Sequence, residues 1–389
     1  MILENSLQHK LKERTEKNLF RQRFKRSTPI EADVIVDGKK YLNFSSNDYL
    51  GLANHPHVIH AFKKGVDQYG VGSGASALLG GYTHAHHALE EELAHFFNYP
   101  RCLLFSSGFM ANSGVIHALT QKKDSIFIDK LAHASLIDAS LSSPAALFRY
   151  KHNNTIDLKH KLKKSIHAIP FLITEGVFSM EGDLACLEKL ISIKNETKGV
   201  LIVDDAHGIG VIGNKGQGST EGKQHAVSML VGTFGKALGT SGAFVAGSDV
   251  SIEALIQYAR SYIYTTAQAP ALCEATRASL KLLESETWRR THLNNLIAYF
   301  QTQANSLGLT ILKSSTPIQA ILLGEDKKTM ICFEQLKKRG VWVAAIRPPT
   351  VPPGRSLLRI TLNAHHQISH LDYLLSCLSY FLINKNDEL

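Results

Sequence analysis

The sequence has few of the features that mark disorder, disulfide frameworks or membrane spans. Its 389 residues include only 11 prolines and are 44% hydrophobic, which argues against wholesale disorder. The five cysteines form no CxxC pair, which argues against a zinc knuckle or a disulfide framework and fits a reducing compartment. No apolar run approaches the roughly 20 residues that cross a bilayer, and the first residues, MILENSLQHK, lack the apolar core of a signal peptide. We expect a soluble, cytoplasmic protein without a membrane partner.

Charge of one sign is in excess. Lysine and arginine number 43 against 34 aspartates and glutamates, a net charge of +9. Such a surface tolerates phosphates, coenzyme A, acidic proteins or nucleic acid. The basic residues cluster at 10–26 without an RNA-binding aromatic motif, so we expect no nucleic-acid partner. The polar segment 1–30 is predicted to be helical; it is either a solvated face or a surface that receives an acidic partner.

The middle of the chain alternates short apolar runs with stretches of helical period. The runs are continuous rather than alternating, as in strands that are buried on both faces. This predicts an α/β fold with a mostly parallel central sheet flanked by helices, followed by a smaller C-terminal α+β domain. We place an N-terminal segment at 1–45, a large domain at 46–285 and a small domain at 286–389. The predicted strands lie in RCLLFSS, SIFIDK, FLITEGVF, GVLIVDDAH, SMLVGTFG and GAFVAG.

Two nucleotide-binding motifs fail on inspection. Gly235-Lys236 resembles the end of a phosphate-binding loop, but Ala237 stands where that loop needs Ser or Thr, and Leu230 where it needs Gly. The run GIGVIG at 208–213 matches GxGxxG and follows a strand, but a turn-rich segment follows it where a helix should begin. Neither motif supports a nucleotide site.

A metal site is not expected either. His84 and His87 stand three residues apart in a predicted helix, but no third ligand follows at a suitable spacing. We interpret them as surface histidines.

Polar residues follow several of the predicted strands. In open α/β sheets the ligand lies beyond the carboxyl ends of the strands, so these residues should converge. A lysine among glycines can act as a nucleophile, an acid can hold a protonated ring nitrogen, and a helix N-terminus can hold a phosphate. These are the three groups by which enzymes hold pyridoxal 5′-phosphate (PLP). The strand-end residues are Gly108, Phe109, Glu175, Ser179, Asp204, Asp205, His207, Thr233 and Lys236.

The segment TFGKALGTSGA resembles the Schiff-base lysine segment of the α-oxoamine synthases. These fold-type I PLP enzymes are acyltransferases that join an amino acid to an acyl thioester with loss of carbon dioxide. Further segments resemble the same family in the family's order, and together they cover residues from about 40 to 365. They are YLNFSSNDYLGL, GSGASALLGG, LLFSSGFMAN, HASLIDA, TEGVFSMEGD, IVDDAHGIGVIG, YARSYIYTT and AIRPPTVPPG.

Within the family, RQRFKR, IYTT and AIRPPTVPPG most resemble the members that act in biotin biosynthesis. The resemblance implies that L-alanine condenses with a pimeloyl thioester carried on coenzyme A or acyl carrier protein. A sibling activity that joins glycine to acetyl-CoA is the alternative. The resemblance also implies a homodimer with a shared active site.

The resemblance assigns cofactor contacts to particular residues. Lys236 carries the Schiff base, Asp204 pairs with the ring nitrogen, and His207 bonds the phenolic oxygen. His133 stacks on the ring and is placed to polarise the thioester carbonyl. The remaining contacts are Ser179 at the ring edge, Gly108, Phe109 and Thr233 at the phosphate, and Thr265 and Thr266 from the second subunit.

The resemblance also assigns substrate contacts. Asn47 and Arg359 meet the amino-acid carboxylate, and Arg21, Arg347 and Thr350 lie along the path of the acyl chain. Many relatives have an arginine where this chain has Leu357, which leaves Arg359 the only arginine of LLRITL.

Overall fold

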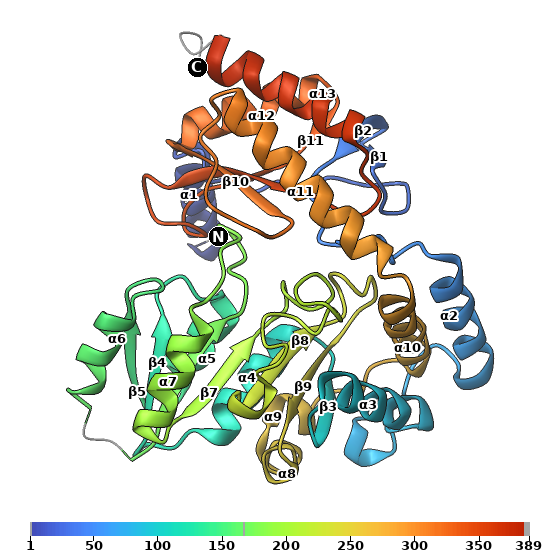
Figure 1. The fold of residues 1–389 in the computed structure, drawn as a ribbon, viewed down its shortest axis with the longest axis vertical. Coiled ribbons are helices and arrows are strands. Elements are labelled where there is room, and N and C mark those ends of the chain that lie inside the picture. The colour runs from blue at the N-terminus through green and yellow to red at the C-terminus, as the bar shows by residue number, and fades with distance from the viewer. Residues whose placement is uncertain (1, 166–167, 385–389) are drawn as a thin grey trace. The chain divides into compact units, whose positions relative to one another are not determined.

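The computed structural model describes residues 2–165 and 168–384 (Figure 1). The described chain divides into two compact units. The large unit comprises 48–179 and 183–290, and the small unit comprises 2–47, 180–182 and 291–384. The division of the chain into 1–45, 46–285 and 286–389 stays a prediction, and residues 385–389 of its last part lie outside the described residues.

A mixed sheet forms the centre of the large unit. In the described residues its seven strands follow the order β3-β9-β8-β7-β6-β4-β5, with β9 antiparallel to both neighbours and the other pairs parallel. This confirms the predicted fold class. The sequence analysis missed β5, an edge strand whose residues are mostly half-buried and form no continuous apolar run. The strands are β3 (Arg101–Phe105), β4 (Ser125–Asp129), β5 (Ala146–Tyr150), β6 (Pro170–Glu175), β7 (Val200–Asp204), β8 (Met229–Thr233) and β9 (Ala243–Gly247).

Helices cover both faces of this sheet because successive strand residues point to opposite sides. Ile126 and Ile128 of β4 pack in one core cluster with residues of α4 (Gly108–Leu119), α5 (Ala134–Ser142) and α8 (Asp249–Tyr258). Phe127, between them, packs in a second cluster with residues of α6 (Thr155–Leu162) and α7 (Leu187–Thr197). The sheet is therefore buried on both faces, as its continuous apolar runs predicted.

One of the remaining helices of the large unit packs on the antiparallel strand β9. Phe97 of α3 (His84–Phe97) stacks on Phe244 of β9 with ring centroids 4.8 Å apart. The stretch SIEALIQYARSYI does not form one continuous helix: α8 ends at Tyr258, Ala259 is extended, and α9 follows. The other elements here are α2 (Pro56–Tyr69), η1 (Ala77–Leu79), η2 (Gln224–Ala226), α9 (Arg260–Ile263) and α10 (Pro270–Ser285).

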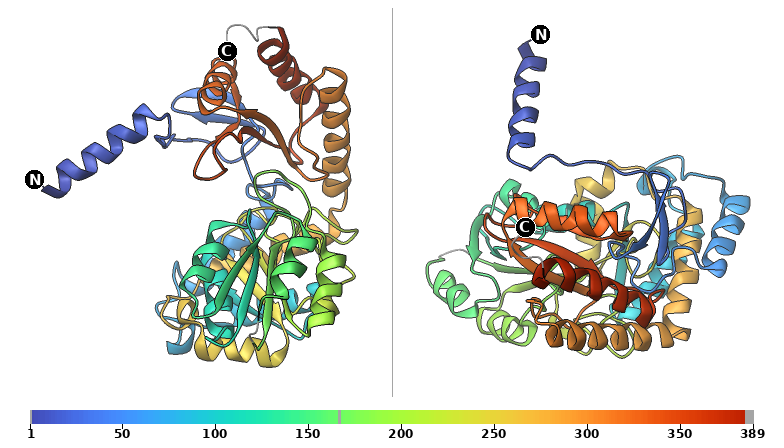
Figure 2. Two further views of the ribbon diagram at one scale, coloured as in Figure 1. Left: turned by 90° about the vertical axis from the view of Figure 1, so that its left-hand side faces the viewer. Right: turned by 90° about the horizontal axis from the view of Figure 1, so that it is seen from above.

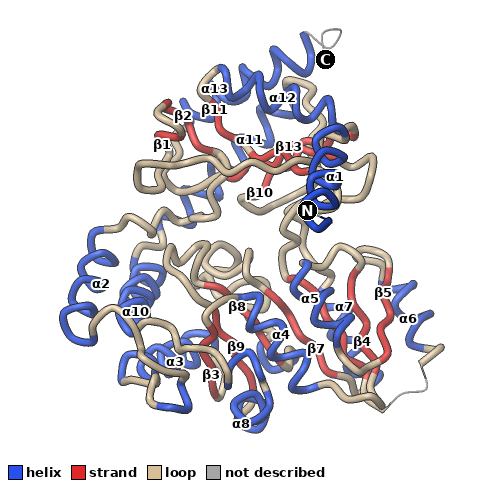
Figure 3. Tube along the Cα trace, turned by 180° about the vertical axis from the view of Figure 1, so that it is seen from behind, coloured by secondary structure: helices blue, strands red, loops and turns tan. Residues whose placement is uncertain are grey.

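The small unit is an α+β arrangement around two three-stranded sheets (Figure 3). The apolar run VWVAAI contributes β11 to one sheet and β12 to the other. The first sheet has β1 (Asp33–Val36), β2 (Lys39–Asn43) and β11 (Val341–Trp342), and the second has β10 (Ile318–Gly324), β13 (Ser356–Thr361) and β12 (Ala344–Ile346). The helices are α11 (Trp288–Ser306), which starts in the large unit, α12 (Asp326–Lys338), α13 (Ile368–Ser379) and the π-helix η3 (Tyr380–Asn384).

The N-terminal helix is shorter than the predicted 1–30. Helix α1 (Ile2–Glu16) has no buried residue (Figure 2). Asn18 adopts a left-handed conformation with φ 55°, and the Leu19 amide donates to the Arg14 carbonyl over 2.8 Å. This helix-ending pattern is typical of a Schellman motif, and asparagine tolerates it better than most residues. The helical prediction was therefore wrong for the residues that follow.

Candidate active site

Asp204 ends β7 and is held by two neighbours. Its Oδ2 accepts a hydrogen bond of 2.7 Å from Asn112 Nδ2, and its Oδ1 accepts one of 3.0 Å from the Ala206 amide. The side chain is 6% exposed. These bonds fix the carboxylate at the end of the strand without a direct cationic partner among them.

A relay of side chains links Asp204 to His133. Asn112 Nδ2 also donates to Ser135 Oγ over 2.9 Å, and Ser135 Oγ lies 2.8 Å from His133 Nδ1. His133 caps α5, where its Nδ1 accepts a hydrogen bond from the Ser135 amide. Because Nδ1 is an acceptor there, the ring proton of neutral His133 lies on Nε2.

The electrostatic surroundings keep His133 neutral. Desolvation lowers the pKa of His133; the charge of Asp204 opposes this, and that of Lys236 adds to it. A neutral imidazole with a proton on Nε2 can donate a hydrogen bond to a carbonyl oxygen. Sequence reasoning missed Asn112 and Ser135, although both stand inside the motifs that indicated the family.

Lys236 lies in a tight loop directly after β8. The Gly239 amide donates to the Lys236 carbonyl over 2.9 Å, and the Phe234 amide donates to Gly242 over 2.9 Å. Its charge acts on the pKa of His133 and of the buried acids Glu175 and Asp205, so the structure brings Lys236 to the predicted strand ends. Burial raises the pKa of Asp205 to about 7.

His207 meets a residue that the sequence analysis did not single out. Its Nδ1 shares a hydrogen bond of 2.6 Å with the hydroxyl of Tyr49. Tyr49 is fully buried and His207 is 6% exposed. Tyr49 therefore fixes the orientation of this imidazole ring.

In the small unit, Asn47 and Arg359 are in contact. Both terminal nitrogens of Arg359 donate to Asn47 Oδ1 over 3.2 Å, and Nη1 also reaches Thr361 Oγ1 at 3.3 Å. Arg359 lies on β13 and is 6% exposed. The pair therefore presents a guanidinium and an amide at one place, a combination suited to a carboxylate.

A groove of about 500 Å³ lies beside this pair in the small unit. Its wall includes β12, which pairs with β13 so that Ala344 stands opposite Arg359. Arg21 donates to Thr350 Oγ1 over 3.3 Å, and Arg347 donates to the Asn18 carbonyl. The apolar lining includes Phe20, Phe24, Met330, Phe333, Trp342 and Ile346.

Comparisons with known proteins agree with this geometry. The model of the family "Aminotransferase class I and II" matches residues 39–378. The 8-amino-7-oxononanoate synthase of Cellvibrio japonicus is 49% identical over 97% of this chain and 95% of its own length. The structure of the Francisella tularensis enzyme of that name has a TM-score of 0.77 at 34% identity, covering 90% of this chain and 99% of its own.

A third comparison shows the cofactor. Serine palmitoyltransferase from S. paucimobilis, solved with a bound PLP–myriocin aldimine, has a TM-score of 0.91 at 26% identity, and the match covers 96% of each chain. This chain belongs to the α-oxoamine synthase family. Like the family as a whole, it is a fold-type I enzyme that depends on pyridoxal 5′-phosphate.

The residues of this α-oxoamine synthase fit the phosphate of the cofactor. Helix α4 begins at Gly108, and its cap, Ser107, accepts a hydrogen bond from the Met110 amide. A Cβ atom on Gly108 would lie 2.6 Å from Thr233 Cγ2, so only glycine allows this close approach. Within the described residues Thr233 Oγ1 is buried without a hydrogen-bond partner. A helix N-terminus beside an unsatisfied hydroxyl is a suitable phosphate site. Phe109 is half-exposed next to it.

Ser179 lies in a short hairpin that follows β6. Val177 and Leu184 form its bridge, and the His152 ring packs edge-on against Phe178 with centroids 4.4 Å apart. Ser179 is 8% exposed. The hairpin thus brings Ser179 to the same edge of the sheet as Asp204.

His152 holds this hairpin to the end of β4. Its Nδ1 lies 3.0 Å from Asp129 Oδ1, and its Nε2 lies 2.9 Å from Asp183 Oδ2. Burial by itself lowers the pKa of His152, but both carboxylates outweigh it and raise the pKa to about 10. The doubly paired imidazolium escaped the sequence analysis because its partners are 23 and 31 residues away.

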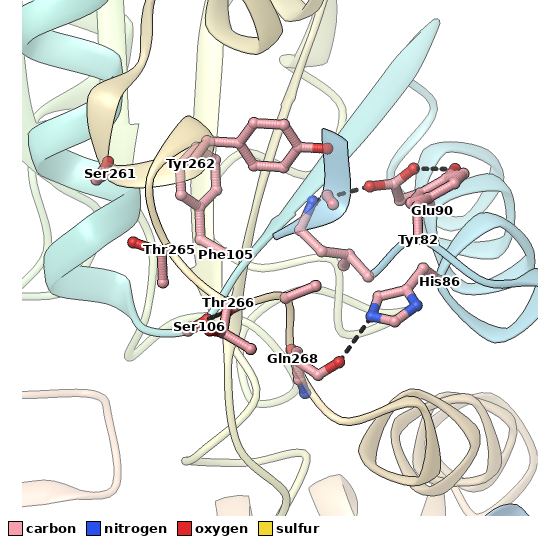
Figure 4. A pocket seen from close by; sticks show the side chains of 13 residues that line it. Tyr82, His86, Glu90, Phe105, Ser106, Ser261, Tyr262, Thr265, Thr266 and Gln268 are labelled. Carbon is pink, nitrogen blue, oxygen red and sulfur yellow. Dashed lines mark hydrogen bonds between the residues drawn. The ribbon is translucent and has the colours of Figure 1, made fainter. Parts of the chain in front are cut away.

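Thr265 and Thr266 line a separate small pocket of about 20 Å³ in the large unit (Figure 4). Ser106 Oγ donates to the Thr266 carbonyl over 3.3 Å. Inside the pocket Glu90 accepts hydrogen bonds from the Tyr82 hydroxyl and the Leu104 amide, and His86 Nε2 lies 2.8 Å from the Gln268 carbonyl. A pocket of this volume holds about one water molecule rather than a cofactor.

The described residues, 2–165 and 168–384, contain no group of three or more histidines, cysteines or acids that could hold a metal ion. His87 lies 3.3 Å from Glu91 on the surface of α3. Over the same ranges, no helix is both long and apolar enough to cross a membrane.

Proposed function

We propose that this enzyme condenses L-alanine with a pimeloyl thioester to give 8-amino-7-oxononanoate, with release of carbon dioxide and the carrier thiol, in biotin biosynthesis. The relatives of that name match nearly the whole chain. The observation that carries the proposal is the small-unit groove, whose apolar wall and two arginines accompany the Asn47–Arg359 pair. A pimeloyl group needs an apolar channel with a cation at its end, whereas an acetyl group needs neither.

The large unit supplies the groups that handle protons and hold the cofactor. When bound, PLP draws electrons from the α-carbon of the amino acid. Lys236 would hold the cofactor covalently until the alanine amine takes its place, and the freed Nζ would then take the α-proton and later return one. Asp204, held by Asn112, would keep the ring nitrogen protonated, and His207 would bond the phenolic oxygen. His133 would stack on the ring and would donate from Nε2 to the thioester carbonyl as negative charge develops there.

The remaining residues of the proposed site bind the cofactor and orient the two substrates. Gly108, Phe109 and Thr233 hold the phosphate, and Ser179 contacts the ring edge. Asn47 and Arg359 orient the alanine carboxylate. In this proposal Arg21, Arg347 and Thr350 guide the acyl chain along the groove.

We further propose a homodimer in which a second copy of the chain contributes Thr265 and Thr266 to each phosphate site. Exposed apolar side chains of the large unit support a covered surface in solution: Tyr264, next to Thr265 in the sequence, is 71% exposed, and Val71 and Leu79 are 85 and 82% exposed. Mixing an inactive Lys236→Ala chain with an inactive Thr265→Arg chain should restore activity if sites are shared. No recovery in mixed dimers argues against a shared site.

The carrier of the pimeloyl group is coenzyme A or acyl carrier protein, and both are acidic. We propose that the basic N-terminal segment receives it in the cytoplasm. A KM for the thioester that rises steeply with salt supports this role, and a KM independent of salt contradicts it.

The direct test offers purified enzyme alanine, glycine or serine, each with pimeloyl, acetyl or succinyl thioesters. We expect the highest kcat/KM for alanine with the pimeloyl thioester. A preference for glycine with acetyl-CoA would instead identify the sibling activity of glycine C-acetyltransferase, also named 2-amino-3-ketobutyrate CoA ligase.

A further inference from the structure

Glu175 is a buried acid to which neither the sequence analysis nor the proposed mechanism gives a role. It ends β6 and is 3% exposed. It stands directly opposite Asp204 in the parallel pairing of β6 with β7. Two carboxyl groups therefore lie side by side at the strand ends, near the charge of Lys236.

The contacts of Glu175 reach two loops of the site. Its carboxyl group accepts hydrogen bonds from the backbone amides of His133 and Ser179. His133 follows β4 and Ser179 follows β6, and these strands are neighbours in the sheet. Within the described residues Oε1 makes no hydrogen bond. One carboxyl group thus joins the two loops that carry the ring-stacking and ring-edge residues.

The electrostatic surroundings favour the protonated form of this group. Full burial raises the pKa of Glu175 well above its usual range, the charge of Asp204 raises it further, and Lys236 and the two amide bonds only partly oppose this. Two buried carboxylates facing one lysine would repel each other. A neutral carboxyl group avoids this repulsion and still accepts both amide hydrogen bonds.

We propose that Glu175 is a positioning residue: an uncharged bridge between the loops of His133 and Ser179 that holds both residues for the cofactor ring. This inference rests on the roles proposed for His133 and Ser179 but not on the choice of acyl substrate. A bridge of this kind requires an acceptor of the right length and no negative charge, so glutamine should replace it and leucine should not.

The experiment compares Glu175→Gln and Glu175→Leu as holoenzymes without any amino acid or thioester, so its outcome is independent of the proposed reaction. We expect E175L to bind PLP at least about tenfold more weakly, because two amides lose their acceptor, and E175Q to recover most of that affinity. The pH midpoint of the lysine–PLP absorption band should move by less than about 0.3 pH unit in E175Q. Glu90→Gln is the matched control: Glu90 is also buried, and its bonds go to Tyr82 and Leu104 rather than to His133 or Ser179.

Two results overturn the proposal. A midpoint lowered by more than about one pH unit in E175Q shows that wild-type Glu175 is a charged carboxylate. If wild type and E175L bind PLP with equal affinity, Glu175 does not position His133 and Ser179 for the cofactor. If E175L fails to fold, the infrared difference spectrum between wild type and E175Q decides: the C=O stretch of a protonated carboxyl supports the proposal, and a carboxylate band contradicts it.

Discussion

The large and the small unit bind their proposed ligands with different kinds of side chains. In the large unit Asp204, His207 and Ser179 are less than 10% exposed, and each stands at or just after a strand end. In the small unit Arg21 and Thr350 are exposed and come from irregular segments 329 residues apart. Groups that perform chemistry are thus fixed by the sheet before a ligand arrives, whereas groups that recognise a long chain keep rotamer freedom. Substitutions in the large unit should therefore reduce kcat, and those in the groove should change KM.

The largest effect is expected from Lys236→Ala. The variant loses the covalent anchor and the base together, so kcat should fall by on the order of 10⁴-fold or more. Borohydride treatment of the holoenzyme should no longer fix PLP to the chain, as mass spectrometry will show. Lys189→Ala, which removes an exposed lysine of α7, is the control and should retain activity. Near-normal turnover in the Lys236 variant refutes the assignment.

Asp204→Asn comes next. The amide keeps the size and the bond to Asn112 but removes the charge that, in the proposed mechanism, holds the ring nitrogen protonated, so kcat should fall roughly 10²- to 10⁴-fold. Steady-state kinetics on the PLP-saturated variant measure this. If instead only the KM for alanine changes, Asp204 binds substrate rather than taking part in the chemistry. The proposed difference between large-unit residues, which act on kcat, and small-unit residues, which act on KM, is then wrong.

Arg359 lies in the small unit but, unlike Arg21 and Thr350, it is buried, and Arg359→Gln tests its proposed role. Loss of a charged hydrogen-bonding partner should raise the KM for alanine about 10- to 100-fold with a smaller effect on kcat. The KM for the thioester is the internal control and should stay nearly constant. If only the KM for the thioester rises, Arg359 contacts the acyl chain rather than the carboxylate of alanine.

Arg21→Gln should have a smaller effect because the side chain is exposed. We expect the KM for the pimeloyl thioester to rise about three- to tenfold, less at high salt, with the KM for alanine unchanged. Lys25→Gln, an exposed nearby cation outside the groove lining, is the control. If Arg21→Gln and Lys25→Gln show identical kinetics, Arg21 does not contact the acyl chain.

His152→Gln is predicted to affect stability more than turnover. The folded-state pKa of about 10 lies above the ordinary value of 6.5, so the imidazolium contributes fully below pH 6.5 and its contribution is lost as the pH rises through about 10. Urea unfolding should show wild type more stable than H152Q by on the order of 2 kcal/mol at pH 6, with the gap closing toward pH 10. Breaking the exposed Lys159–Glu196 pair with Lys159→Gln should change the stability much less, because water screens this pair. A constant gap across this pH range contradicts the ion-pair account.

The fold was predictable where its signals were local. Continuous Val, Ile and Leu runs identified the strands that are buried on both faces. The local signals were insufficient where pairing with a neighbouring strand decided the structure. The edge strand β5 lacks a continuous apolar run, and VWVAAI changes sheet after two residues because β2 and β13 take different parts of it.

The site divides in the same way. Some site residues stand in motifs that could be recognised from the sequence alone, namely Lys236, Asp204, His207 and His133. Tyr49, Asn112, Glu175 and His152 could not be assigned, because each acts through a partner far away in the sequence.

The sequence by itself determined the family, the cofactor and the order of the strands' polar ends, because residue types and spacings are properties of the chain. Only the tertiary structure decided which of those polar groups touch. The parallel register that sets Glu175 beside Asp204 brings together residues 29 positions apart. Burial there governs which acids keep a proton, and no one-dimensional pattern contains the solvent exposure on which that depends.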